Sequence, residues 1–184
     1  MRQIKEERLI MNKENVNIKQ LDPSDLPAAV EVIRASFATV AKEFNITEEN
    51  CPDYVAFVTT TERLQNHFNW GWFMYGLYAV GRDDPDAPQM VGYVSLSKKI
   101  GEAGVFELHN LAVLPEYRHK SYGKQLIERC KSKVKELGGN KIKLGMIEEN
   151  TVLKNWYAAN GFIHTGFKWF KNWPFKAGFM EWEG

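Results

Sequence analysis

Apolar residues recur along the chain with two different periods, and the helical period is clearest in the first quarter. Steps of three and four residues run through positions 26–40, which predicts one amphipathic helix there. Asp22 and Pro23 supply an N-cap and a first helical position ahead of it. Thr59 and Glu62 form a capping-box pattern, so we expect a second, shorter helix to begin there.

Runs of aromatic and β-branched residues bounded by polar turns predict strands. These runs are residues 16–20, 72–80, 90–96, 105–114, 141–147, 162–169 and 175–182. Apolar stripes at helical spacing predict two later helices, at residues 123–137 and 152–159. Gly138 and Gly139 end the first of these helices in the way that a left-handed C-cap does.

The order of these elements predicts a mixed sheet. Strands 72–80 and 90–96 are expected to pair antiparallel across the Pro-rich loop 81–88. A helix separates strands 105–114 and 141–147, and such a βαβ unit requires a parallel pair with a right-handed crossover. We therefore predict an α/β fold of the mixed α+β kind, in which one central sheet carries helices on both faces.

Length, charge and cysteine content narrow the class of protein. The chain has 184 residues, the size of one domain, and we expect residues 1–15 to be an extension and residues 16–184 the domain. A net charge of +1 offers no basic excess for nucleic acid. Cys51 and Cys130 make neither a disulfide framework nor a zinc site. Because the N-terminus is charged and lacks an apolar stretch, we expect no signal peptide there, and no apolar run reaches the ~20 residues of a membrane span. We expect a cytoplasmic protein that binds no metal, nucleic acid or membrane.

The stretch between strand 105–114 and helix 123–137 holds the first candidate chemistry. Unpaired N–H groups at a helix start favour an anion, and Gly123 allows a close approach of its backbone. Basic side chains surround this start: Arg118, His119, Lys120 and Lys124. The stretch predicts a phosphate or diphosphate site, although an ordinary solvated helix start fits the composition equally well. The glycine spacing excludes a Walker loop and a dinucleotide fingerprint.

This stretch resembles motif A of the GNAT superfamily of N-acetyltransferases, whose pattern is Arg or Gln, two residues, Gly, one residue, and Gly or Ala. Arg118 fills the first position and Gly123 the last, while Ser121 stands where the middle glycine is expected. In the family this loop holds the pyrophosphate of coenzyme A, and a splayed parallel strand pair holds the pantetheine arm. The resemblance therefore implies acetyl-CoA as cosubstrate, bound by Leu111, Ala112, Val113, Arg118, His119, Lys120, Ser121, Tyr122, Gly123, Lys124 and Asn150.

A second run is similar to the family's motif B, in which Asn precedes a short helix that ends in Tyr-x-x-x-Gly-Phe. Asn150, Tyr157, Gly161 and Phe162 match this motif in type and spacing. The resemblance implies that Tyr157 is the catalytic acid that protonates the leaving thiolate. Without the motif, Tyr157 would be interpreted as a packed core tyrosine and Asn150 as an N-cap.

Glu107 is the candidate general base, because the histone-type branch of the family carries a glutamate eleven residues ahead of the motif arginine. Strand alternation is expected to put Glu107, His109, Leu111 and Val113 on one face. Partial burial there would raise the pKa of the glutamate, whereas a solvated or salt-bridged glutamate is the plain alternative. His109 on the same face could accept the proton instead, or contact substrate.

The resemblance implies an acetyl-CoA-dependent N-acetyltransferase that moves an acetyl group to a primary amine of a small molecule or protein by direct attack in a ternary complex. Neither cysteine lies in a motif position, which argues against an acetyl-cysteine step. The alternative is a catalytically weak coenzyme A-binding regulatory or interaction module, since Ser121 departs from the motif. Interleaved lysines and aromatics at residues 168–176 suggest a third reading, a nucleic-acid site, but net charge does not support it. A homodimer stays open, because many members of the family dimerise.

Overall fold

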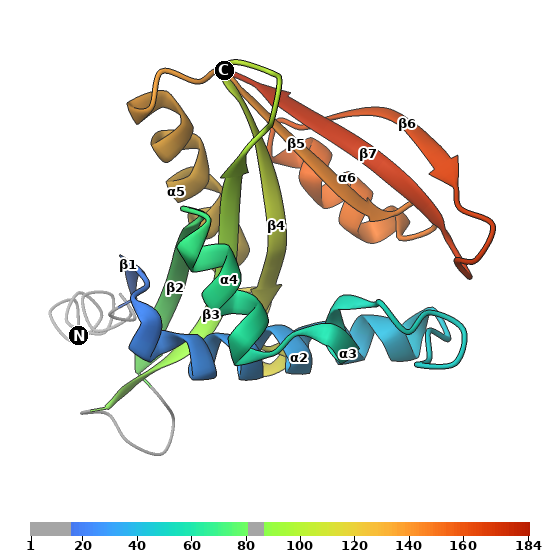
Figure 1. Cartoon of the computed structure of the whole chain (residues 1–184), viewed down its shortest axis with the longest axis horizontal. Coiled ribbons are helices and arrows are strands. Elements are labelled where there is room, and N and C mark those ends of the chain that lie inside the picture. Colours follow the sequence, from blue (N-terminus) through green and yellow to red (C-terminus); the bar gives the residue numbers. More distant parts are fainter. Residues whose placement is uncertain (1–15, 81–86) are drawn as a thin grey trace, which may run out of the picture.

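One sheet organises the chain in the computed structural model, which describes residues 16–80 and 87–184 (Figure 1). The strands follow the order β1-β2-β3-β4-β5-β7-β6. Their bounds are β1 (Asn17–Gln20), β2 (Phe73–Val80), β3 (Pro88–Lys98), β4 (Val105–Val113), β5 (Lys141–Ile147), β6 (Ile163–Trp169) and β7 (Lys176–Glu183). Neighbouring strands are antiparallel except β4 and β5, which are parallel, so the predicted mixed sheet is confirmed. The expected extension, residues 1–15, and most of the predicted loop 81–88 lie outside the described residues.

Helices cover both faces of this sheet, as predicted. Their bounds are α2 (Leu26–Glu43), α3 (Val55–Val58), α4 (Thr61–Asn69), α5 (Tyr122–Glu136) and α6 (Thr151–Ala159), with 3-10 turns η1 (Pro23–Asp25) and η2 (Pro115–Tyr117). Alternate residues of one strand serve the two faces. In β2, Met74 joins the core under α2 and α4, whereas Tyr75 and Leu77 join the core under α5 and α6.

The helix starts in the first third follow the predicted capping chemistry, with one error. Asp22 caps the turn ahead of α2 by accepting a hydrogen bond from the Ser24 N–H (2.8 Å). The cap of α4 is Thr60, which accepts from the Arg63 N–H (3.1 Å), so the prediction of Thr59 was wrong by one residue. Thr59 instead donates its hydroxyl to a carbonyl oxygen of α3, a single turn that carries no periodic signal in the sequence.

The apolar stripe of α5 is buried over most of its predicted length. Its buried members are Leu126, Ile127, Cys130 and Val134. Leu137 was expected to continue the stripe but is 40% exposed, because it is the C-cap residue. Gly138 follows with a φ of 73°, and the Gly139 N–H reaches back to the Val134 carbonyl (2.8 Å), so the predicted left-handed C-cap is confirmed.

The parallel strands β4 and β5 pair only at their beginnings and then separate. The register runs from Val105 opposite Lys141 to Glu107 opposite Lys143. Beyond Glu107, β4 stays with β3, while β5 continues with β7 and β6 as a second arm that points away in Figure 1. The expected splayed pair is therefore present, and residues 108–113 have one edge that no described strand pairs.

A β-bulge interrupts β4 beside this opening. His109 lies opposite Ser95 and Ala112 lies opposite Tyr93, so two residues of β4 face a single residue of β3. Asn110 occupies the bulge with a φ of 51°, in the left-handed region that asparagine tolerates better than most residues. Strand β4 therefore accommodates one residue more than the facing stretch of β3 while it stays paired in the sheet.

The bulge changes which side chains share a face. Glu107 and His109 lie on the face of α2 and α4, and the bulge returns Ala112 to that face. Leu111 and Val113 pack toward the core under α5 instead. The prediction of one face for Glu107, His109, Leu111 and Val113 was wrong, because strict alternation does not continue through a bulge.

Candidate active site

A cleft of about 380 Å³ opens at the point where β4 and β5 separate. It is lined from both strands and from β7 by side chains that include Glu107, Leu108, His109, Leu144, Gly145 and Phe179. Leu108 belongs to the core under α5, whereas His109 stacks against Trp72 on the opposite face. The residues that line the cleft therefore come from both faces of the sheet.

The first turn of α5, which follows β4, begins without a side-chain cap. Ser121 occupies the N-cap position with a φ of 61° and gives the helix no side-chain hydrogen bond. The first backbone bond across this turn runs from the Gln125 N–H to the Ser121 carbonyl (3.1 Å). The N–H groups of Gly123 and Lys124 precede it and have no acceptor within the helix, which is the arrangement that suits an anion.

Gly123 lets a second helix approach this uncapped turn. A Cβ atom at Gly123 would lie 3.2 Å from ring atoms of Trp156 on α6, closer than an ordinary van der Waals contact. The start of α5 is therefore in contact with α6, and a side chain at this position would displace the indole. The glycine in the motif thus has a packing role here as well as the expected role of exposing the backbone.

Arg118 fastens the loop ahead of α5 to other elements. Its Nε donates to the Val113 carbonyl of β4 (3.2 Å), and its Nη2 donates to the Ser36 carbonyl (3.1 Å) and the Thr39 hydroxyl (2.9 Å) of α2. The guanidinium is thus engaged by the protein and positions the loop. The sequence-based expectation that it binds phosphate stays a prediction.

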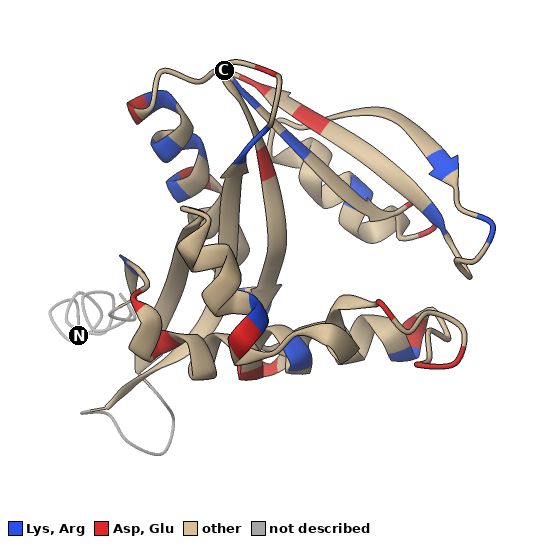
Figure 2. Ribbon diagram, viewed as in Figure 1, with Lys and Arg blue, Asp and Glu red and all other residues tan. Residues whose placement is uncertain are grey.

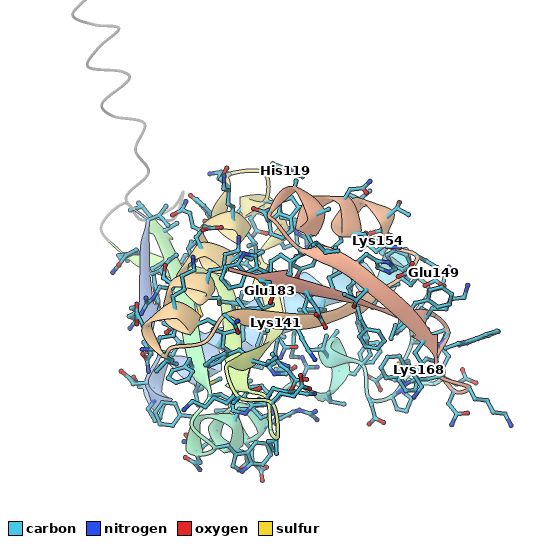
Figure 3. The ribbon with its side chains drawn as sticks, turned by 90° about the horizontal axis from the view of Figure 1, so that it is seen from above. His119, Lys141, Glu149, Lys154, Lys168 and Glu183 are labelled. Carbon is cyan, nitrogen blue, oxygen red and sulfur yellow. The ribbon has the colours of Figure 1, made fainter. Side chains whose placement is uncertain are left out.

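The other basic residues of the loop lie at the surface. His119, Lys120 and Lys124 are exposed, and Figure 3 shows His119 at the edge of the molecule, well apart from Lys168 on β6. The Lys120 ammonium lies over the ring of Tyr117 (5.5 Å to the centroid). Tyr122 is different, since its side chain is buried in the core, and its expected role toward cosubstrate stays a prediction.

The start of α6 is capped from within the protein. The Asn150 Oδ1 accepts a hydrogen bond from the Leu153 N–H (3.0 Å), as in the N-cap interpretation of this residue. Asn150 is itself buried. Its side-chain oxygen is therefore used by the helix, and a role toward cosubstrate stays a prediction.

The end of α6 explains the spacing of motif B and holds Tyr157 in place. The Phe162 N–H bonds to the Tyr157 carbonyl (3.1 Å) and the Gly161 N–H to the Ala158 carbonyl (3.0 Å), a Schellman motif with Gly161 at a φ of 85°. The rings of Tyr157 and Phe162 pack edge to face with centroids 5.4 Å apart. Tyr157 is buried, and this burial raises the pKa of its phenol well above the ordinary range, so the hydroxyl stays protonated.

Glu107 lies in the cleft but is paired with a lysine. Its Oε1 is 2.6 Å from the Lys99 ammonium, and about a third of each side chain is exposed. Further ion pairs lie at the beginning of β5, where Lys143 meets Glu102 (2.6 Å) and Lys141 meets Glu181 of β7 (3.5 Å). Figure 2 shows basic and acidic segments of β5 and β7 side by side near the C-terminus. Glu107 therefore corresponds to the salt-bridged glutamate that the sequence left open.

His109 is the second titratable group of β4 in the cleft, and it is held on two sides. Its Nε2 lies 2.9 Å from the Ser97 hydroxyl, and its ring stacks on Trp72 with centroids 4.3 Å apart and planes 19° from parallel. Burial lowers the pKa of the imidazole to about 4, so the ring is neutral at pH 7.

Sequence reasoning missed the partners of these two groups: Trp72, Ser97 and Lys99. Ser97 and Lys99 carried a usable signal, since they are polar residues at alternate positions at the end of an otherwise apolar strand. Trp72 carried none, because an indole ahead of a strand is indistinguishable from a core residue. Leu111, Ala112 and Val113, expected to bind pantetheine, lie in the part of β4 whose second edge no described strand pairs, and their role toward pantetheine stays a prediction.

The described residues hold no group of three or more metal-ligating side chains. In the same parts of the chain, no helix is long and apolar enough to cross a membrane.

The chain belongs to the acetyltransferase (GNAT) family, whose profile matches residues 44–162. The family that the two motifs resembled is therefore confirmed. A curated relative is described as an uncharacterized N-acetyltransferase in the pepI 3′ region of Lactobacillus delbrueckii subsp. lactis. It is 26% identical over 153 residues, which cover 79% of this chain and 83% of the relative.

Solved structures of similar proteins share the fold. The PaiA N-acetyltransferase from Thermoplasma acidophilum, in complex with coenzyme A, has a TM-score of 0.73 at 23% identity, covering 92% of this chain and 99% of that one. The ribosomal-protein-S18-alanine N-acetyltransferase from Escherichia coli has a TM-score of 0.68 at 16% identity, covering 91% and 93%. At these identities the likeness establishes the architecture.

Proposed function

We propose that the protein is an acetyl-CoA-dependent N-acetyltransferase that moves an acetyl group to a primary amine of a small molecule or a protein. The observation that carries this proposal is the uncapped start of α5, beside the end of a strand whose edge is open. Orphan N–H groups suit a diphosphate, and an unpaired strand edge suits the amides of a pantetheine arm. Membership of the acetyltransferase family supports the same conclusion.

The N–H groups of Gly123 and Lys124 bind the diphosphate of the cosubstrate, with the side chains of Lys120 and Lys124 adding positive charge nearby. Ser121 takes the left-handed conformation that a glycine adopts at lower cost, so its departure from the motif keeps the loop geometry. Residues 111–113 of β4 hold the pantetheine arm through their backbone.

The transfer is direct. The nitrogen of the acceptor attacks the thioester carbonyl, the C–N bond forms, and the C–S bond breaks. Tyr157 donates a proton to the departing thiolate, which the buried and protonated phenol is suited to do. A backbone N–H near Leu111 stabilises the carbonyl oxygen. The amine proton passes to a base on β4, either Glu107 or His109.

No cysteine takes part in this reaction. Cys51 and Cys130 are both buried, and burial raises the pKa of each thiol, so neither forms a thiolate nucleophile easily. Unpaired thiols also agree with the reducing cytoplasm that the sequence suggests as location.

Incubation of the protein with acetyl-CoA and a panel of primary amines, followed by detection of released thiol, tests the proposal. We expect amine-dependent thiol release and a calorimetric Kd for coenzyme A in the micromolar range. Binding without thiol release from any amine would favour the alternative, a coenzyme A-binding regulatory module. This alternative is motivated by Ser121, which stands where the motif has a glycine. Absence of binding would overturn both.

A further inference from the structure

Three aromatic side chains from separate elements form one continuous stack beside the cleft. The ring of His67 on α4 stacks on Trp72 with centroids 3.9 Å apart and planes 12° from parallel. The other face of Trp72 stacks on His109 of β4 at 4.3 Å and 19°. His109 is the member of this stack that lines the cleft. Trp72 therefore fixes the plane of an imidazole in the candidate active site.

A hydrogen bond fixes the rotation of the same imidazole. The Ser97 hydroxyl of β3 lies 2.9 Å from Nε2 of His109, and His109 itself lies opposite Ser95 in the ladder. Among the described residues, no protein group is bonded to Nδ1, and this nitrogen is not sealed from solvent. When Nε2 carries the hydrogen and donates it to Ser97, the lone pair of Nδ1 is available to a ligand.

The neighbouring carboxylate, that of Glu107, is less available to accept a proton. Glu107 is bound to Lys99 at 2.6 Å, so it must give up a charge-assisted hydrogen bond before it accepts a proton. Its carboxylate can remain paired and still act at a distance, because it lies two residues from His109 on the same face. It then stabilises a positive charge that forms on the imidazole.

We propose that His109 is the general base, that its Nδ1 accepts the proton from the acceptor nitrogen, and that Trp72 and Ser97 are the positioning residues for this step. The assignment rests on the proposed N-acetyltransferase function and selects between the two bases that it left open. As the C–N bond forms, the acceptor nitrogen becomes acidic and its N–H bond breaks toward Nδ1. The resulting imidazolium donates from both nitrogens and then loses its proton to solvent.

The charged and titratable groups around His109 agree with a neutral resting state. Burial under Trp72 is the largest influence and lowers the pKa of the imidazole, and His67 of α4 and Lys99 beyond β3 act in the same direction. Glu107 on its own strand acts against them. The imidazole is thus unprotonated over the whole physiological range and is ready to accept a proton.

The first test compares His109→Gln with Glu107→Gln, with acetyl-CoA affinity measured for both. We expect His109→Gln to lower kcat about 100-fold with unchanged affinity, and Glu107→Gln to lower it less than about tenfold. A larger loss in Glu107→Gln than in His109→Gln would overturn the assignment. If the wild type itself releases no thiol with any amine, the proposed function fails, and the second test still decides the state of His109.

The second test uses nitrogen-15 NMR of the histidines in the whole protein, compared with Trp72→Leu, Ser97→Ala and the control Trp70→Leu. Trp70 is 70% exposed and touches His67 without stacking on His109. In the wild type we expect the tautomer with hydrogen on Nε2. Trp72→Leu should move the pKa of His109 toward the ordinary value of about 6.5, and the acid limb of the kcat/KM profile with it. Ser97→Ala should mix the tautomers, and Trp70→Leu should change neither property.

A resting tautomer with hydrogen on Nδ1 would overturn the proposal, because that nitrogen could not accept the proton. An unmoved acid limb in a folded Trp72→Leu variant, with the NMR pKa shifted as expected, would also overturn it. Ser97→Thr keeps the hydroxyl and should restore both the tautomer and the rate that Ser97→Ala loses.

Discussion

Two helices, α5 and α6, each begin after a strand of the parallel pair, and their first turns are built differently. The first turn of α6 is satisfied by Asn150, whose side chain accepts from the Leu153 N–H. In the first turn of α5, Ser121 takes a left-handed conformation and its side chain makes no cap hydrogen bond. A protein normally satisfies such donors itself, and this difference is what supports the proposal that a ligand binds at the start of α5.

The same comparison separates two tasks. Helix α6 is capped at both ends, by Asn150 at its start and by the Schellman bonds of Gly161 and Phe162 at its end. This capped helix carries Tyr157. The open start of α5 is the part that suits an anion. We therefore expect changes in α6 to alter the chemical step and changes at the start of α5 to alter binding.

The largest expected effect comes from removing the phenol that α6 holds. Tyr157→Phe keeps the ring contact with Phe162 and should lower kcat at least about 100-fold while leaving the Kd for acetyl-CoA within twofold. Stopped-flow thiol detection and calorimetry measure the two quantities. An unchanged kcat would remove Tyr157 from the chemistry.

A charge placed at the open start of α5 should come next. Gly123→Asp puts a carboxylate among the orphan N–H groups and a Cβ against Trp156, and we expect it to raise the Kd for acetyl-CoA about 30-fold, or about 2 kcal/mol.

The matched control is Val152→Asp, at the second helical position of α6 as Gly123 is of α5, and 78% exposed. It should leave the Kd within twofold. If both variants weaken binding equally, the two helix starts do not differ in the way proposed.

Removing the N-cap side chain of α6 should lower the stability of the fold, whereas the corresponding change at the start of α5 should not. Asn150→Ala leaves the Leu153 N–H without its acceptor, and we expect the free energy of unfolding to fall by about 1 kcal/mol in a urea titration. Ser121→Ala removes no cap bond and should change it by less than about 0.3 kcal/mol. Equal losses in the two variants would contradict the comparison.

The smallest effect should be a gain at Ser121. With a φ of 61°, this residue adopts a conformation that is unfavourable for side chains with a Cβ atom, and Ser121→Gly should stabilise the fold by about 0.5 kcal/mol. A rise in thermal midpoint of about 1–2 °C, with coenzyme A binding retained, is the measurable result. A fall would mean that the hydroxyl has a role that the loop geometry does not reveal.

Local patterns in the sequence predicted the succession of strands and longer helices along the chain and the parallel pair, and the resemblance to two motifs indicated the family. What escaped prediction depends on contacts between distant residues or on single torsions. The partners of Arg118 in α2 lie about 80 residues away, and the Trp72–His109 stack joins the residue before β2 to β4, which is not a neighbour of β2 in the sheet. Thr59 and Thr60 are chemically identical as caps, so only the backbone decides between them.

The left-handed Asn110 marks the place in β4 where a change in length leaves the two faces of the strand as they are. Removing Asn110 would restore regular pleating, and Leu111, Ala112 and Val113 would keep their present faces, because the bulge holds one residue more than the facing stretch of β3. Removing a residue at a regular position of the strand would instead turn every side chain beyond it toward the opposite layer of helices. We infer that this strand tolerates the loss of a codon at the bulge better than at its regularly paired positions.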